Sequence, residues 1–168
     1  MNLAELNQAD SEQARIELLK CCGSSKWVNN ILAVRPFSSK AQLYLQAERI
    51  WLELGKDDYL EAFAAHPKIG ESKAPVKAKN TESWTRKEQA GMLNAADPLK
   101  LELEKLNRKY EKKFGYIFII CATGKSAGEM LDLLQQRLEN IPLIELRIAA
   151  SEQNKITNLR LKKMLADT

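Results

Sequence analysis

The stretch Tyr116-Ile117-Phe118-Ile119-Ile120-Cys121-Ala122 decides the fold class. Its apolar, β-branched and aromatic residues are typical of a buried strand. The rest of the sequence offers no second strand with which it would pair, so we expect an extended buried connector (residues 116–122) inside a helical protein. The chain is therefore predicted to be an all-α bundle of seven or eight helices.

Helical periodicity flanks this connector on both sides. The clearest predicted helix begins at Ser38 or Ser39 and ends at Gly55, which we expect in the left-handed conformation that terminates helices. Its apolar stripe has four members at helical spacing: Leu43, Ala47, Ile50 and Leu54. Further helices are predicted over residues 11–22, 25–35, 57–66, 85–95, 98–114, 127–141 and 142–165. Residues 70–82 show no periodicity and are predicted to form a surface loop.

Short polar residues mark the expected starts of these helices. The predicted caps are Asp10 or Ser11, Ser24 or Ser25, Asp57 or Asp58, Asp97 before Pro98, and Ser126. Gly115 is expected to end the helix that precedes the connector.

Length, charge and cysteine content bound the class of protein. A chain of 168 residues suffices for a single domain (residues 1–168) without disulfides or metal. The formal charge of +4 comes from interleaved acidic and basic residues, which favours a solvated surface over nucleic-acid binding. Three cysteines are an odd number and indicate reduced thiols. No leader or long apolar run is recognisable, so we expect a cytoplasmic protein that does not bind a membrane.

His66 is the only histidine of the chain, and it stands immediately before Pro67. Because proline disfavours helical geometry in the residue before it, His66 is predicted at the C-terminal edge of a helix. Two interpretations remain open. The imidazole either interacts with the last carbonyls of the helix, or serves as a proton-transfer group. A lone histidine excludes a His-based metal site, so catalysis here is expected to be metal-free.

Two further segments carry polar candidates with more than one interpretation. Thr85-Arg86-Lys87-Glu88 matches the capping box, which is the favoured interpretation of Glu88, although a catalytic role stays open. Gln89 offers an amide suited to a ureide or carboxamide edge. Arg160 lies between two leucines, where a guanidinium either extends to the surface or binds a carboxylate in a buried position.

Four segments, taken in order and spacing, resemble the OHCU decarboxylase family, which acts on 2-oxo-4-hydroxy-4-carboxy-5-ureidoimidazoline. They are His66-Pro67-Lys68-Ile69-Gly70, Thr85-x-x-Glu88-Gln89-Ala90-Gly91, Asn107-x-x-Tyr110-Glu111-x-x-Phe114-Gly115-Tyr116-x-Phe118-Ile119, and Lys155-Ile156-x-x-Leu159-Arg160-Leu161. The resemblance implies an all-helical homodimer that decarboxylates the small molecule OHCU to (S)-allantoin in urate degradation, without a cofactor.

The resemblance also implies roles for individual residues. His66 would transfer the proton with Glu88 as its carboxylate partner, and Arg160 would meet the anionic side of the substrate. The remaining pocket residues would be Pro67, Thr85, Gln89, Phe118, Ile119, Ile120, Cys121 and Ala122. Two positions depart from the common family pattern: Lys68 replaces an arginine and Thr85 a serine. Arg147 is a second candidate for the guanidinium, and only motif position favours Arg160.

Two other functions compete with this hypothesis. In a non-catalytic helical interaction module, His66 and Glu88 would only cap helices. A weak nucleic-acid binder would use the lysine-rich loop and the last helix, with a steep salt dependence.

Overall fold

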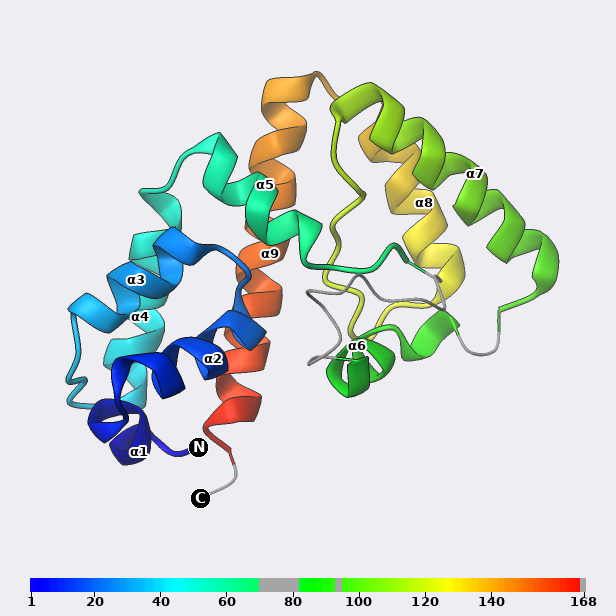
Figure 1. Cartoon of the computed structure of the whole chain (residues 1–168). Coiled ribbons are helices and arrows are strands. Elements are labelled where there is room, and N and C mark those ends of the chain that lie inside the picture. Colours follow the sequence, from blue (N-terminus) through cyan, green and yellow to red (C-terminus); the bar gives the residue numbers. More distant parts are fainter. Residues whose placement is uncertain (70–81, 93–94, 167–168) are drawn as a thin grey trace. The chain divides into compact units, whose positions relative to one another are not determined.

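The computed structural model describes residues 1–69, 82–92 and 95–166 (Figure 1). These residues contain nine α-helices, one short 3-10 helix and no strand, which confirms the all-α class and slightly exceeds the predicted number of helices. None of these helices is long and apolar enough to cross a membrane. The predicted surface loop lies almost wholly outside the described residues.

The chain divides into two compact units, residues 1–62 with 154–168 and residues 63–153. The division falls within helices α5 (Lys56–Ala64) and α9 (Pro142–Met164). A single domain over residues 1–168 stays a prediction.

The first unit is built from short capped helices. They are α1 (Leu3–Gln8), α2 (Ser11–Cys21), α3 (Ser25–Ala33) and α4 (Lys40–Leu52), together with most of α5 and the C-terminal part of α9. The side chains of Asp10, Ser24 and Ser39 each accept a hydrogen bond from the first turn of the helix that follows, which confirms them as caps. The buried Trp27 joins α3 to α4 by donating its Nε1–H to the Ala47 carbonyl at 3.1 Å.

The end of α4 differs from the prediction. The helix ends at Leu52, and its capping residue Glu53 has right-handed geometry. Gly55 does not adopt a positive φ; its N–H donates instead to the Asp58 carboxylate at 3.1 Å. The glycine therefore belongs to the start of α5, where the acidic side chain satisfies a backbone donor that the helix leaves unpaired.

The second unit contains α6 (Glu82–Glu88), the 3-10 helix η2 (Ala90–Met92), α7 (Asp97–Phe114) and α8 (Ala127–Leu138). Helices α7 and α8 pack side by side (Figure 1). Asp97 is not a cap, because it is already the first residue of α7 and Ala96 before it makes no side-chain capping bond. Gly115 ends α7 with a φ of 85°, as predicted. Ser126 caps α8 in a reciprocal pair with Glu129.

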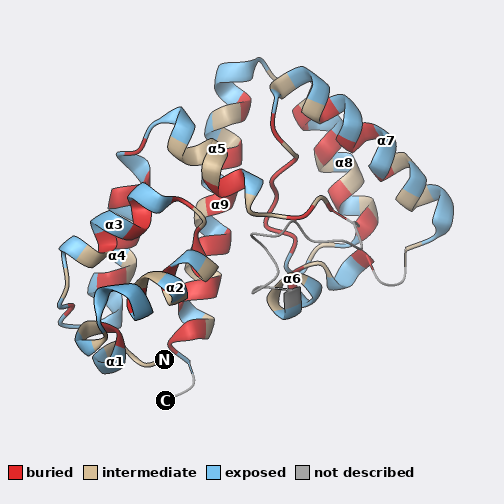
Figure 2. Cartoon of the chain, viewed as in Figure 1, coloured by how far each residue is buried: buried red, intermediate tan, exposed pale blue. Residues whose placement is uncertain are grey.

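Residues 116–122 run between α7 and α8 as an extended buried connector, which confirms the prediction made from their composition. All of them except Ile117 are buried (Figure 2). The Phe118 ring meets the Tyr110 ring of α7 edge-on at 5.3 Å between centroids. Aromatic and aliphatic packing therefore replaces the neighbouring strand that such a sequence normally requires.

Candidate active site

His66 lies just beyond α5, where the chain turns into the buried Pro67. Its backbone N–H donates to the Phe63 carbonyl at 3.1 Å, which confirms the predicted position at the end of a helix. Its ring Nε2 lies 2.7 Å from Oε1 of Gln153, a fully buried residue of α9. An amide oxygen can only accept, so in this contact Nε2 donates and carries a proton. The imidazole is thus held in one orientation by an uncharged partner.

Glu88 is the last residue of α6, and its side chain is buried. The capping-box interpretation is wrong, because α6 begins at Glu82 and Thr85 lies inside it. The Thr85 carbonyl accepts a helical bond from the Gln89 N–H at 2.9 Å. The expected helix over residues 85–95 is therefore a shorter helix that starts earlier and is followed by η2. Glu88 consequently does not lie at a helix N-terminus.

Gly91 brings this segment against the end of the connector. A Cβ atom at Gly91 would lie 2.1 Å from the Lys125 carbonyl oxygen, so only glycine permits the backbones to approach this closely. The Lys125 ammonium in turn donates to the Cys121 carbonyl at 2.7 Å. Burial raises the pKa of the Cys121 thiol; a backbone bond at Thr123 and the Lys125 ammonium oppose this, while the carboxylates of Glu152 and Glu88 add to it. Of the predicted site residues, Glu88 and Cys121 therefore interact electrostatically.

Side chains hold the backbone of the connector at several points. Arg137 of α8 donates to the Ile119 carbonyl at 2.7 Å. The Cys121 N–H donates to the Glu152 carboxylate over a longer 3.4 Å. Because no second strand pairs with the connector in the part of the chain that the structure describes, these bonds fix the directions of its peptide groups.

Arg160 belongs to the first unit, where it is 4% exposed. Its guanidinium donates to the Lys20 carbonyl near the end of α2 at 3.1 Å. The interpretation as a surface residue is therefore wrong. Arg147, the other candidate, is exposed. Burial thus favours Arg160 as a guanidinium held in a fixed position.

Two polar residues of α9 were not predicted as site residues from the sequence. Gln153 contacts the His66 ring, and Glu152 accepts a hydrogen bond from the Cys121 N–H. One signal was available, because several positions on the buried side of α9 are polar rather than apolar. These are Glu145, Glu152, Gln153, Thr157 and Arg160. Buried polar side chains are nearly always hydrogen-bonded, so such a set within one helix indicates specific polar contacts with the elements packed against it.

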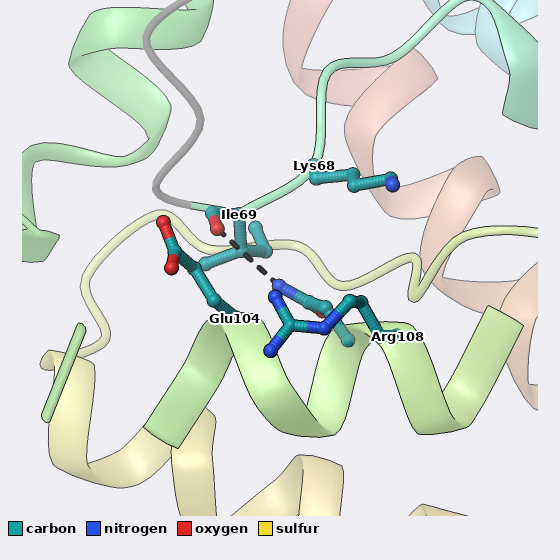
Figure 3. A pocket seen from close by; sticks show the side chains of 5 residues that line it. Lys68, Ile69, Glu104 and Arg108 are labelled. Atoms are coloured by element: carbon teal, nitrogen blue, oxygen red, sulfur yellow. Dashed lines mark hydrogen bonds between the residues drawn. The ribbon is translucent and has the colours of Figure 1, made fainter. Parts of the chain in front are cut away.

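A hollow of about 230 Å³ lies beside the segment that follows His66 (Figure 3). Its lining residues are Lys68, Ile69, Glu104, Asn107 and Arg108. Lys68 also pairs with Glu111 at 3.0 Å. None of the predicted site residues lines this hollow. Within residues 1–69, 82–92 and 95–166, no three His, Cys, Asp or Glu side chains are grouped so that they could hold a metal ion.

Comparisons with known proteins agree on one family. Residues 7–162 match the family model described as OHCU decarboxylase. The chain is 42% identical over 149 residues to the uric acid degradation bifunctional protein TTL of Arabidopsis thaliana, covering 88% of this chain but only 46% of that protein. It is 26% identical over 166 residues to the 2-oxo-4-hydroxy-4-carboxy-5-ureidoimidazoline decarboxylase of Halalkalicoccus jeotgali, covering 98% and 92% of the two chains. A crystal structure of OHCU decarboxylase in the presence of (S)-allantoin matches with a TM-score of 0.78 and 35% identity, over 95% of this chain and all of that one.

Proposed function

Because the chain belongs to the OHCU decarboxylase family, we propose that it decarboxylates OHCU to (S)-allantoin in urate degradation, with no cofactor. The names of its relatives support this substrate and product. The observation that carries the proposal is the single imidazole fixed beyond α5 by its 2.7 Å contact with Gln153, in the same unit as the buried carboxylate of Glu88.

The proposed reaction makes three demands on the protein. Loss of carbon dioxide leaves an electron pair on a ring carbon, and the adjacent ring carbonyl delocalises it as an enolate. The protein has to hold the ring in one orientation and stabilise the developing charge on oxygen with N–H donors. It also has to deliver a proton to one face of the carbon, since the spontaneous reaction gives racemic allantoin.

His66 and Glu88 are proposed to carry the proton transfer. An imidazole titrates near neutral pH, so it can both release and take up a proton under physiological conditions. A positioned acid or base of this kind contributes about 10²- to 10⁴-fold in rate. A buried carboxylate stabilises the protonated imidazole, which is the state that donates the proton.

The remaining site residues are proposed to bind the substrate. Phe118, Ile119, Ile120, Cys121 and Ala122 would line the pocket and present backbone donors, apart from the Cys121 N–H, which donates to the Glu152 carboxylate. Pro67, Thr85 and Gln89 would shape the pocket. Arg160 would bind the anionic side of OHCU, since a planar guanidinium matches a carboxylate with two parallel bonds.

Circular dichroism of freshly prepared OHCU tests the proposal directly. Wild-type protein is expected to produce the (S)-allantoin signal faster than the spontaneous reaction. His66→Ala and Glu88→Gln are expected to lose about 10²-fold or more of that acceleration with helix content unchanged. Glu53→Gln, which removes an exposed carboxylate of the first unit, is the control and should keep full activity. A wild-type protein without acceleration, or fully stereospecific His66→Ala and Glu88→Gln variants, would exclude this function.

We also propose a homodimer that works in the cytoplasm. The family resemblance supports the dimer, which light scattering can measure. The three cysteines are buried and free, which fits a reducing compartment.

A further inference from the structure

A buried ion pair connects the two helices that follow the connector. Arg137 of α8 donates its Nε–H to the Glu145 carboxylate of α9 at 2.7 Å, and Nη2 lies 2.6 Å from the same oxygen as an ion-pair contact. Glu145 is fully buried and Arg137 is 7% exposed. A buried ion pair is weak evidence for stability, because desolvation of both charges opposes their attraction. The contacts of Arg137 and Glu145 indicate a role other than stabilising the fold.

Three groups converge on the Glu145 carboxylate and fix it. Besides Arg137, the Tyr110 hydroxyl of α7 donates to Oε1 at 2.6 Å, and the Asn140 amide donates to Oε2 at 2.9 Å. Burial and the bond to Glu145 both raise the pKa of Tyr110, so this hydroxyl stays a donor at all physiological pH values. The carboxylate is thus a rigid anchor for the Arg137 guanidinium.

Arg137 in turn holds the backbone of the connector in place. While Nε and Nη2 face Glu145, Nη1 donates to the Ile119 carbonyl at 2.7 Å. The guanidinium also lies over the Phe118 ring, 4.4 Å from its centroid. Because the planar fork of arginine holds these contacts at once, the direction of the Ile119 carbonyl follows from the position of Glu145.

The carbonyl of Ile119 and the N–H of Ile120 belong to one planar peptide group. In a trans peptide these two bonds point in opposite directions, so the Ile120 N–H points away from Arg137. Ile120 is buried, and no group among residues 1–69, 82–92 and 95–166 accepts a hydrogen bond from its N–H. Buried N–H groups are nearly always bonded, so this donor is suited to a ligand.

We propose that Arg137 and Glu145 are positioning residues that, through the Ile119 carbonyl, aim the Ile120 N–H at the substrate oxygen on which charge develops during decarboxylation. This inference rests on the proposed function and adds two residues that do not touch the substrate. The donor is set before the reaction begins, so no reorganisation is needed when the charge forms.

The double variant Arg137→Met/Glu145→Gln tests the role without leaving a buried charge unpaired. It is expected to keep the fold, since both charges leave together and Gln still accepts from Tyr110. Its kcat should fall by roughly 10²-fold with KM little changed, as is typical when a donor that acts on the transition state is lost. Met130→Ala is the matched control, because Met130 is fully buried in the same helix; it should lower stability but not kcat.

A selective NMR label reads the same peptide group directly. Ile119-Ile120 is the only Ile-Ile pair in the sequence, so protein labelled with carbonyl-¹³C and ¹⁵N isoleucine gives one HNCO peak. Addition of (S)-allantoin is expected to shift this peak in wild type and in Met130→Ala, and to shift it much less in the double variant. A wild-type peak that (S)-allantoin leaves unmoved would overturn the inference.

The outcomes separate this inference from the proposed function. Inactive wild-type protein refutes the proposed function, whereas an active wild type with an equally active, folded double variant refutes only the role of Arg137 and Glu145. If the double variant does not fold, Arg137→Lys replaces it, since this variant keeps the charge and loses the fork. Its kcat should also fall, and a wild-type kcat would again contradict the inference.

Discussion

His66 Nε2 lies 2.7 Å from Gln153 Oε1, so a buried amide of α9 contacts the only imidazole of the chain. This pairing orients the ring without contributing a charge of its own. A charged partner at the same position would favour the imidazolium, and the proton would then be held more tightly.

Gln153→Glu should therefore raise the pKa of His66, by about 1 pH unit or more, because a carboxylate stabilises the protonated ring. Because the protonated imidazole is the proposed proton donor, the falling limb of the pH-rate profile should move to higher pH with it. Since the chain has one histidine, its ring signal in an NMR titration gives this pKa without assignment. Gln153→Leu, which adds no charge, is the control. An identical pKa in wild type and Gln153→Glu would show that this contact does not govern His66.

Arg160→Lys should raise KM for OHCU by about tenfold, the equivalent of about 1.4 kcal/mol in binding, since an ammonium lacks the planar fork. Steady-state kinetics by circular dichroism measures the change. Arg147→Lys is the matched control on the same helix, because Arg147 is exposed, and it should behave as wild type. Unchanged kinetics in Arg160→Lys would show that this guanidinium does not bind the substrate.

Gly91→Ala should destabilise the protein by about 1–3 kcal/mol, because the new methyl group meets the Lys125 carbonyl at 2.1 Å and backbone has to move. Urea denaturation measures the loss. Gly128→Ala in α8 is the control: its nearest neighbour would be 3.9 Å away, so it should be neutral or stabilising by up to about 1 kcal/mol. Equal stability of the two variants would contradict the close approach at Gly91.

Alkaline pH should destabilise the fold through two buried thiols. Burial raises the pKa of Cys21 and of Cys22 to about 12, although the nearby Arg160 partly opposes this. The unfolded thiols ionise first, near pH 9, so the stability that these thiols contribute is complete below pH 9 and is lost as pH rises toward 12. The slope reaches about 1.4 kcal/mol per pH unit for each thiol. The double variant Cys21→Ala/Cys22→Ala should show a shallower decline in urea midpoints from pH 9 to 11; an equally steep decline would refute the assignment.

Local signals predicted much of the fold. Asp10, Ser24, Ser39 and Ser126 cap the helices expected of them, since a short polar side chain next to an amphipathic segment satisfies donors of the same turn. The prediction failed at Thr85, because a capping-box pattern also occurs inside helices. It failed at Gly55 because the bond to Asp58 fixes that glycine in place of a left-handed terminus.

The site was predictable only in part. Pro67 disfavours helical geometry in the residue before it, and this local rule was sufficient to place His66 at the end of a helix. Its partner Gln153 lies 87 residues further along the sequence, and no pattern near His66 indicates that α9 supplies it. The pairing of Arg137 with Glu145 depends on how the chain turns between α8 and α9. Tertiary packing decides such contacts, and single-sequence periodicity does not record it.

The connector also affects how this protein denatures when it is heated. Residues 116–122 contain no charge, proline or glycine, a composition that forms intermolecular sheets once it is exposed. Lys112 and Lys113 before it and Lys125 after it repel a second copy and delay such association. When α8 detaches, those lysines are the remaining protection, so we expect thermal denaturation to end in β-rich aggregates rather than in a reversible loss of helix.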